Sequence, residues 1–483
     1  MNLEAYYRDR YVRERMSEYC GGYGGNPRTF TSAYLVGYGP VKFANGQNHK
    51  AVPNEMFDWI LNSRLDIFRS VWDHQYLIML LDIEYYNVDY PAEILLNPRL
   101  AFSKLLPVHH ATEEILRGYG ISHLTIMTGQ GFHYVSRIPI ACDLYTEMCK
   151  NGNIEKSLEG RYRMLNHFSL DMGRAYESAG RMMEFLIHKI IRYASPNSPI
   201  PIYISDVAPP RGPKGREGVS LDLTMFGDGI HARDMRLPFS THQKHLAKKW
   251  YYGEHVTSKI PLRVSLPVIR ENPLDLLEAR EELTVAAEIA ARVSTEIPVE
   301  IDGWSKMYED YLNSELKAFH DEFDSEQHDS WTEWPRTYLA FNYSWLPPCV
   351  RHVFANANPE LLKPTQIQLI TRILLSLGWH PKHIAGLIRA YYETNRGWGN
   401  MWYSQDAATR ANWWVRVYSG LIVCGLDELV DLNCVSHKER GYCVASCCSY
   451  NLMSFQSPAL DYARSFSKKC ILQNSIPPES SNR

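Results

Sequence analysis

In the segment YLIMLLDIEYY, residues 76–86, a continuous apolar run ends in two carboxylates. The run is short and polar turns flank it, which favours a buried strand over a helix. Asp82 and Glu84 lie two residues apart, so on a strand their side chains point to the same face of the sheet. The stretch therefore predicts a buried strand that presents a pair of carboxylates near its end.

The flanking segments predict an α+β fold around this strand. A second strand over 123–127 leads into a glycine loop over 128–131, and a third strand follows over 132–138. Apolar residues spaced three and four apart predict helices over 57–68, 157–192, 365–379 and 382–394. The acidic run that ends the helical segment 272–333 is typical of a solvated connector.

The composition is that of an ordinary globular protein. A chain of 483 residues, 45% hydrophobic and 22% charged, suits about two to four domains and excludes a collagenous or mainly disordered protein. The net charge of −3 gives no global signal for nucleic acid, so such a partner needs a local basic patch. Because no apolar leader and no apolar run of about 18 residues occurs, we expect a soluble, cytoplasmic protein with no membrane partner.

The carboxylate pair is the first candidate for chemistry. Two carboxylates on one face of a strand can bind two divalent cations about 3.5–4 Å apart, the arrangement that supports phosphoryl and nucleotidyl transfer. The alternative is a strand end that passes into solvent.

The glycine loop TGQGFH, residues 128–133, is the second candidate. Its glycines let the backbone approach a phosphate closely, while Thr128, Gln130 and His133 offer a hydroxyl, an amide and an imidazole to the phosphate oxygens. A glycine hairpin with a satisfied histidine is the alternative interpretation.

The third candidate lies in LDLTMFGDGIHARDMRLPFSTHQKH, residues 221–245. Asp222 is on a strand-like stretch and can complete a trio with Asp82 and Glu84. The basic and polar side chains downstream can bind a triphosphate: Arg236, Ser240, His242 and Lys244. Residues 211–249 hold eight Lys and Arg against four Asp and Glu, a basic patch in an acidic chain, although a solvated charged face would show the same count.

In chain order, these three segments resemble the motif series of the archaeo-eukaryotic primase superfamily, which includes replicative small primase subunits and primase-polymerases. Three motifs match in the same order over residues 76–245. They are D-x-E, a loop close to S-G-x-G-F-H in which Thr128 stands in place of serine, and a strand aspartate followed by R-x-P-x-S-x-H-x-K. The resemblance implies a primase-like catalytic domain with a mixed sheet.

The cysteines form a fourth candidate site. The chain has ten, and without a secretory signal they favour thiolate metal ligation over disulfides. Cys349 lies far upstream of Cys424, Cys434 and Cys443, and a site with four cysteine ligands forms if helices fold back between them. Either Cys447 or Cys448 is an alternative to Cys443 as a ligand.

Residues 346–465 resemble the iron–sulfur domain of the large primase subunit. The resemblance rests on four features in chain order: LPPC, a helical hairpin, C-x9-C-x8-C and SPALDYARSF. This resemblance implies a [4Fe–4S] cluster, with zinc as the alternative that four thiolates also suit. The domains expected are a catalytic domain at 1–270, a helical acidic connector at 271–335 and a helical Cys-rich domain at 336–483.

Together the resemblances imply a DNA-directed primase-polymerase that makes primers de novo or extends DNA. Asp82, Glu84 and Asp222 would hold two Mg²⁺ or Mn²⁺ ions, and the triphosphate would be bound by Thr128, Gln130, His133, Arg236, Ser240, His242 and Lys244. The implied partners are single-stranded DNA template, primer–template duplex, NTP or dNTP, and helicase or other replication or defence proteins. Residues 396–403, which mix arginine with aromatics, are a further candidate for template stacking.

Two other functions are compatible with these patterns. One is a non-catalytic nucleic-acid-binding adaptor in replication or defence, against which the three acids argue, because clustered like charges without metal cost stability. The other is a two-metal nuclease, in which the triphosphate-binding segment would have no obvious role.

Overall fold

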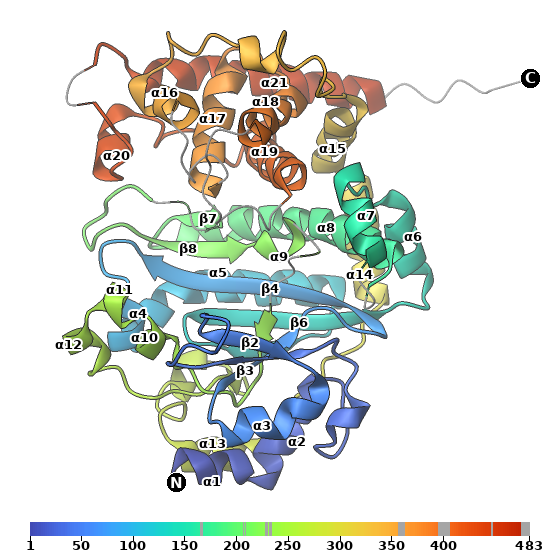
Figure 1. Cartoon of the computed structure of the whole chain (residues 1–483), viewed down its shortest axis with the longest axis vertical. Helices are drawn as coiled ribbons and strands as arrows, with labels where there is room; N and C mark the ends of the chain where they lie inside the picture. Colours follow the sequence, from blue (N-terminus) through green and yellow to red (C-terminus); the bar gives the residue numbers. More distant parts are fainter. Residues whose placement is uncertain are drawn as a thin grey trace, which may run out of the picture.

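Two β-sheets occupy the middle of the molecule, with N-terminal helices at one end and C-terminal helices at the other (Figure 1). This computed structural model describes residues 1–164, 168–205, 207, 209–227, 230, 234–355, 363–394, 406–445 and 448–474. The predicted α+β class is confirmed.

The larger sheet has six strands in the order β10-β5-β6-β4-β8-β7. Its strands are β4 (Tyr76–Asn87), β5 (Leu124–Met127), β6 (Gly131–Pro139), β7 (Ile202–Ile204), β8 (Glu217–Asp222) and β10 (Leu266–Pro267). Neighbours are antiparallel except β7 and β8, which run parallel, so the sheet is mixed as expected. The strands predicted around residues 76–86, 123–127 and 132–138 are confirmed.

The smaller sheet has four antiparallel strands in the order β2-β1-β3-β9. They are β1 (Leu35–Tyr38), β2 (His49–Val52), β3 (Asp66–Ser70) and β9 (Asp234–Arg236). The helix predicted over 57–68 is wrong in its second half, because α3 (Phe57–Asn62) ends before Arg64, whose φ of 55° breaks the helix. Leu65 directly precedes β3 and Phe68 is on it, and both side chains are buried. Their spacing therefore resembled that of the apolar face of a helix.

One face of the larger sheet is covered by α5 (Pro98–Tyr119). Phe132 of β6 stacks on His109 of this helix at 4.7 Å between ring centroids and meets Phe102 edge-on at 5.5 Å. Because side chains alternate along a strand, the other face of β4 and β6 carries Asp82, Glu84 and His133.

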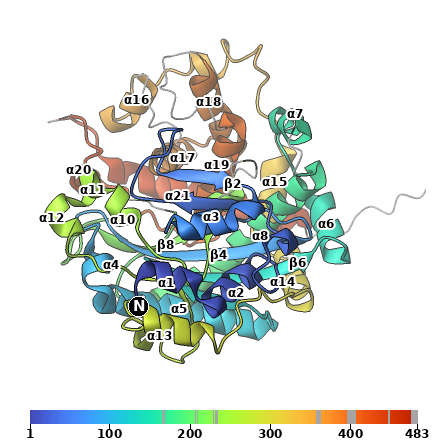
Figure 2. The same cartoon turned by 60° about the horizontal axis from the view of Figure 1, so that its bottom comes forward.

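Helices make up most of the remaining structure. Those of the N-terminal and central parts are α1 (Leu3–Arg8), α2 (Arg10–Tyr19), α4 (Glu93–Leu96), α6 (Asp143–Asn151), α7 (Lys156–Met164), α8 (Leu170–Ala194), α9 (Thr224–Gly227), α10 (Lys244–Ala247), α11 (Lys249–Tyr252), α12 (Glu254–Thr257), α13 (Leu283–Ala290) and α14 (Asp302–Leu312). In Figure 2, α1, α2 and α3 come forward over the sheets.

After β10, every regular element of the described residues is helical. These C-terminal helices are α15 (Glu315–Ser325), α16 (Pro348–Ala355), α17 (Pro364–Ser376), α18 (Pro381–Glu393), α19 (Ala407–Val423), α20 (Cys434–Glu439) and α21 (Gln456–Asn474). The helices predicted at 365–379 and 382–394 are confirmed.

The expectation of a solvated acidic connector is wrong for α15. Phe319 and His320 are fully buried, and the Phe319 ring lies 5.7 Å from that of Phe466 on α21. Asp324 accepts a hydrogen bond of 2.6 Å from Arg181 of α8. The acidic helix therefore packs between the central and C-terminal helices through its apolar face and Asp324, whose buried partner Arg181 the sequence pattern does not reveal.

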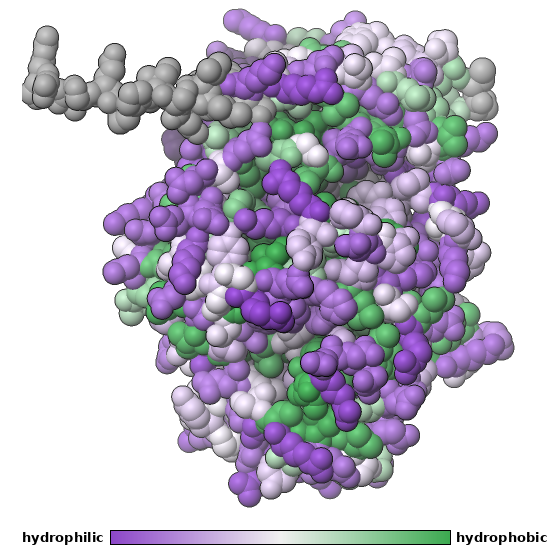
Figure 3. Space-filling model, turned by 180° about the vertical axis from the view of Figure 1, so that it is seen from behind, coloured by the Kyte–Doolittle hydropathy of each residue, from purple (hydrophilic) through white to green (hydrophobic). Residues whose placement is uncertain are grey.

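Buried apolar side chains form one cluster that includes Tyr6 near the N-terminus and Phe466 in α21. The face opposite to that of Figure 1 is mainly hydrophilic, with apolar side chains gathered toward its lower part (Figure 3). Among the described residues, no helix combines the length and the apolar character needed to cross a bilayer.

Candidate active site

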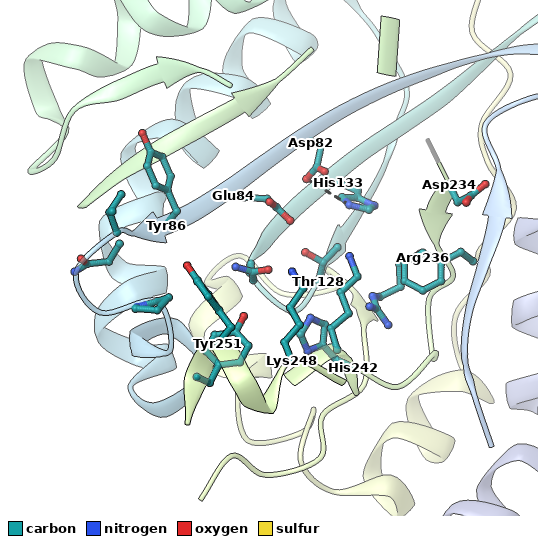
Figure 4. Close-up of a pocket in the computed structure, with 18 of the residues that line it drawn as sticks. Asp82, Glu84, Tyr86, Thr128, His133, Asp234, Arg236, His242, Lys248 and Tyr251 are labelled. Atoms are coloured by element: carbon teal, nitrogen blue, oxygen red, sulfur yellow. Dashed lines mark ion pairs between the residues drawn. The ribbon is translucent and has the colours of Figure 1, made fainter. Parts of the chain in front are cut away.

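A cavity of about 660 Å³ lies between the two sheets (Figure 4). The larger sheet lines it with residues of β4 and β6, and the smaller sheet with residues of β3 and β9. The segment 242–252, which contains α10 and α11, forms a further part of the wall, and Tyr442 of the C-terminal part also lines the cavity. This volume is within the range of sites that bind small molecules and cofactors.

Strand register brings the predicted acids together. Asp82 is the direct cross-strand partner of Asp222 on β8 and of His133 on β6. Directly opposed residues have Cβ atoms about 4.5–5.5 Å apart, on the same face of the sheet. Glu84 shares this face two residues further along β4. Asp82, Glu84 and His133 line the cavity, whereas Asp222 lies beside Asp82, is 9% exposed, and accepts a hydrogen bond of 2.8 Å from the backbone N–H of Thr224.

Two polar atoms at this point are buried without a hydrogen bond. Asp82 Oδ1 lies 3.4 Å from His133 Nε2 but makes no hydrogen bond, and His133 Nδ1 also lacks one. A buried polar group left unpaired costs about 1–3 kcal/mol, so a ligand that pairs with these two atoms inside the cavity would be favoured.

The carboxylates of Asp82, Glu84 and Asp222 are chemically suited to bind a divalent cation. Carboxylate oxygens are the ligands that Mg²⁺ and Mn²⁺ prefer, and Asp82 Oδ1 is an oxygen with unused acceptor capacity. In the ranges described, no group of three or more His, Cys, Asp or Glu is gathered closely enough to hold a metal ion. Binding of an ion would therefore require carboxylate side chains to rotate toward one another.

The glycines of the loop are required by packing. A Cβ on Gly129 would lie 2.1 Å from the imidazole of His242, and one on Gly131 would lie 1.7 Å from the carbonyl oxygen of Ile83. Thr128 and Gln130 also line the cavity, and Thr128 Oγ1 is buried with no hydrogen-bond partner. The loop thus brings the second and third sequence motifs into direct contact.

Opposite the acids, the cavity wall is cationic. Arg236, His242, Lys244 and Lys248 all line it. Burial, with Arg236 and Lys244 nearby, holds the pKa of His242 well below its usual range. Burial and then Arg236 also lower the pKa of Lys244. The repulsion between Arg236 and Lys244 in this desolvated wall favours an anionic ligand, because the ligand would offset it.

Arg236 also has a structural role. Its guanidinium lies 3.1 Å from the buried carboxylate of Asp66, donates to the carbonyl oxygen of Thr241, and lies 4.3 Å from the ring centroid of Phe68. It contributes to the cavity wall while it holds the smaller sheet to the segment that follows β9.

Ser240 lies outside the cavity lining, unlike the other residues of its predicted set. Its hydroxyl is fully buried and accepts a hydrogen bond of 2.7 Å from the backbone N–H of Ile67 in β3. The preceding Phe239 has a φ of 63°, and Ser240 takes part in holding this turn to β3. Its place in the motif therefore reflects the fold of the segment rather than contact with a ligand.

Several cavity residues were not found from the sequence. Asp234 lies near Arg236 at one end, and burial raises the pKa of its carboxyl to about 7. Tyr86 and Tyr251 lie at the other end (Figure 4). The lone aspartate carries no spacing signal, but the basic and aromatic run KKWYY at 248–252 could have indicated a nucleic-acid contact.

The cysteine site is only partly assembled in the described residues. Burial, followed by the nearby thiols of Cys443 and Cys434, raises the pKa of Cys349 to about 11. Cys434 Sγ accepts a hydrogen bond of 3.5 Å from the backbone N–H of Leu452. Cys424 is buried, and Cys448 is exposed. Cys447 and the predicted stacking segment 396–403 lie outside the described residues.

The chain matches no family model, no curated protein and no solved structure in comparisons with known proteins. The geometry of the cavity is therefore the main indication of what the chain does.

Proposed function

We propose that the chain is a template-directed nucleotidyltransferase, a primase-polymerase that makes primers or extends DNA. The observation that carries this proposal is the register of β4, which sets Asp82 beside both His133 and Asp222. Asp82, Glu84 and His133 share one cavity with a cationic wall. An acidic side for metal and a basic side for phosphate are the two requirements of nucleotidyl transfer.

Asp82, Glu84 and Asp222 are the residues that would hold Mg²⁺ or Mn²⁺. When bound, such ions lower the pKa of an attacking 3′-hydroxyl and offset negative charge on the transferred phosphoryl group. The unpaired oxygen of Asp82 supports this assignment.

The triphosphate of the incoming nucleotide would lie against the cationic wall. Lys244 and Arg236 supply positive charge, and the pKa of His242 is low enough that its imidazole is a neutral hydrogen-bonding group. The unpaired hydroxyl of Thr128 and the unpaired Nδ1 of His133 are further groups available to phosphate oxygens. These preorganised groups would stabilise charge that develops as pyrophosphate leaves.

We also propose that Cys349, Cys424, Cys434 and Cys443 hold a metal centre, a [4Fe–4S] cluster or zinc. The approach of Cys349 to Cys434 and Cys443 supports it, as does the backbone N–H donated to Cys434 Sγ. Thiolates ligate either metal, and the centre would order the C-terminal segment.

A primer-synthesis assay tests the proposed activity. The chain is incubated with a single-stranded DNA template, Mn²⁺ and labelled nucleotides, with NTP and dNTP in separate reactions. We expect products longer than one nucleotide, complementary to the template, and none with an Asp82→Asn, Asp222→Asn double variant. Shortened template would instead indicate a nuclease, and binding without any product would indicate an adaptor.

Nucleotide titration tests the phosphate side of the cavity. We expect His133→Gln to raise the KM for nucleotide and lower kcat, together by roughly tenfold in kcat/KM, because its contact would act in both ground and transition states. His110→Gln is the matched control, since His110 is exposed on α5. Unchanged kinetics for His133→Gln would remove this residue from the site.

A further inference from the structure

A second hollow of about 530 Å³ adjoins the cavity. The two share Pro91, Tyr251 and Tyr252 in their linings, so they meet at this aromatic edge. The shared edge is at the end marked by Tyr86 and Tyr251 in Figure 4, away from Arg236. We call this second hollow, between the segments 89–97 and 251–256 with Lys214, the side groove.

Exposed aromatic rings surround the place where the side groove meets the cavity. Trp250 is 83% exposed, Tyr90 61% and Tyr251 49%. The Trp250 and Tyr251 rings lie 5.8 Å apart, and those of Tyr251 and Tyr252 lie 5.0 Å apart. Large aromatic side chains left in water beside a polar cavity are typical of a stacking surface for planar ligands, and every nucleobase has such a face.

The charge of the side groove suits a polyanion. Asp89 has two arginine partners, Arg216 at 2.7 Å and the exposed Arg211 at 3.7 Å, which together exceed its charge. Glu93 accepts hydrogen bonds from Tyr85 and Asn87, so its oxygens are held away from the open groove. The ammonium group of Lys214 is exposed, and the structure gives it no hydrogen bond or ion pair within the described ranges. Lys248, at the cavity side of the edge, is likewise exposed.

We propose that the side groove and its aromatic edge bind a single-stranded nucleic acid, the template strand of the proposed reaction. This inference rests on the proposed function and assigns the strand a position. Bases stack on Tyr90, Trp250 and Tyr251, and Lys214 contacts the backbone phosphates. The strand then reaches the cavity beside Tyr86, two residues beyond Glu84 on β4, so that a template base is presented at the acidic end of the site.

Binding of a labelled oligonucleotide tests the side groove directly. The full chain is titrated against fluorescein-labelled oligodeoxythymidylate of 20 nucleotides, without nucleotide or divalent ion, and fluorescence anisotropy is measured over a series of salt concentrations. We expect Tyr90→Ala and Trp250→Ala each to weaken binding roughly tenfold, in keeping with the loss of one stacked base. Lys214→Ala should reduce the slope of log K against log salt by about 0.7, the value for one single-strand phosphate contact.

Matched controls are available on other surfaces. Tyr23 and Trp331 are each 75% exposed and outside both hollows, so Tyr23→Ala and Trp331→Ala should bind the strand as the unaltered chain does. Lys306→Ala serves the same purpose for the lysine, since Lys306 is exposed on α14.

The outcomes separate this inference from the proposed function. Tyr90 and Lys214 line only the side groove, so their variants should keep the KM for nucleotide at saturating template. If these variants bind the strand normally, or raise the nucleotide KM instead, the inference is overturned even if the chain polymerises. If they lose strand binding but the unaltered chain incorporates no nucleotide, the groove assignment holds and the polymerase proposal fails.

Discussion

The acidic cavity and the cysteine segment were both predicted from spaced motifs, but the structure assembles them to different extents. His133 and Asp222 are on the two strands that flank Asp82, and the hydrogen-bond register fixes the Cβ atom of each about 5 Å from that of Asp82. Cys434 and Cys443 are exposed at one short helix and its following loop. At neither place do the described residues gather three or more His, Cys, Asp or Glu side chains closely enough to hold a metal ion, so the difference lies in how firmly the backbone positions the ligands. A sheet thus organises its site without a ligand, whereas a site on loops depends on the ligand itself for order.

The largest expected effect is that of removing a ligand of the proposed metal centre. Cys349→Ser should abolish bound iron or zinc and selectively destabilise residues 346–465, because a structural thiolate site contributes on the order of 10 kcal/mol of binding free energy. Elemental analysis after anaerobic purification and limited proteolysis measure the two effects.

Cys142→Ser is the matched control for that prediction, because Cys142 is a free cysteine remote in sequence from the proposed ligands. If the unaltered chain contains neither iron nor zinc at near one site per chain, the metal centre is wrong. If Cys443→Ser retains metal while Cys447→Ser loses it, the fourth ligand is Cys447.

Substitution of an acid in the cavity should have the opposite effect, because it should lower the rate of nucleotide incorporation without destabilising the fold. Asp82→Asn should reduce nucleotide incorporation by roughly 10³-fold or more, about 4 kcal/mol in transition-state stabilisation, because the carboxylate serves metal rather than packing. Its melting temperature should stay the same or rise, since one of two adjacent like charges is removed. Asp321→Asn, at an exposed ion pair on α15, is the control, and extension at full rate by Asp82→Asn would contradict the assignment.

The sequence predicts those parts of the fold and the site that depend on local patterns, and not those that depend on contacts between distant segments. The D-x-E strand, the glycine loop and Asp222 were predicted because period-two alternation and local turn chemistry are visible within a few residues. The cross-strand pairing of Asp82 with Asp222 joins positions far apart in the chain. The sequence predicted that Asp222 can complete a trio with Asp82 and Glu84, but not the register that sets Asp222 directly opposite Asp82. Ser240 was predicted to bind the triphosphate and Asp234 was not singled out, because the contact of Ser240 with β3 and the burial of Asp234 near Lys244 both depend on the packing of the two sheets.

A smaller effect tests how tightly the cavity is packed. Gly129→Ala should lower the free energy of unfolding by about 3 kcal/mol and displace His242, because the added methyl group would overlap the buried imidazole. Chemical denaturation and the nucleotide KM report these changes. Gly118→Ala is the control, since nothing lies within 4 Å of a Cβ at that position in α5 and the helix should gain stability. Equal stability of the two variants would show that the glycine loop shifts to accommodate the methyl group, and that the strand register does not fix the geometry of this site.

The smallest effect concerns Asp234, whose carboxyl is buried near Lys244 with a hydrogen bond to Tyr34. Burial raises its pKa from 3.8 to about 7, so the folded state retains the proton to higher pH than the unfolded state does. The free energy of unfolding should therefore fall as pH rises from about 4 to 7, and the cost of the buried charge should be fully present above pH 7. Asp234→Asn removes that charge but keeps an acceptor for Tyr34, so the variant should match the unaltered chain near pH 4. Above pH 7 it should be more stable by about 2 kcal/mol, roughly half of the full conversion of the shift because the group is not completely buried. Urea denaturation at a series of pH values measures the difference, and a gain that does not vary with pH would mean that the effect comes from packing and not from ionisation.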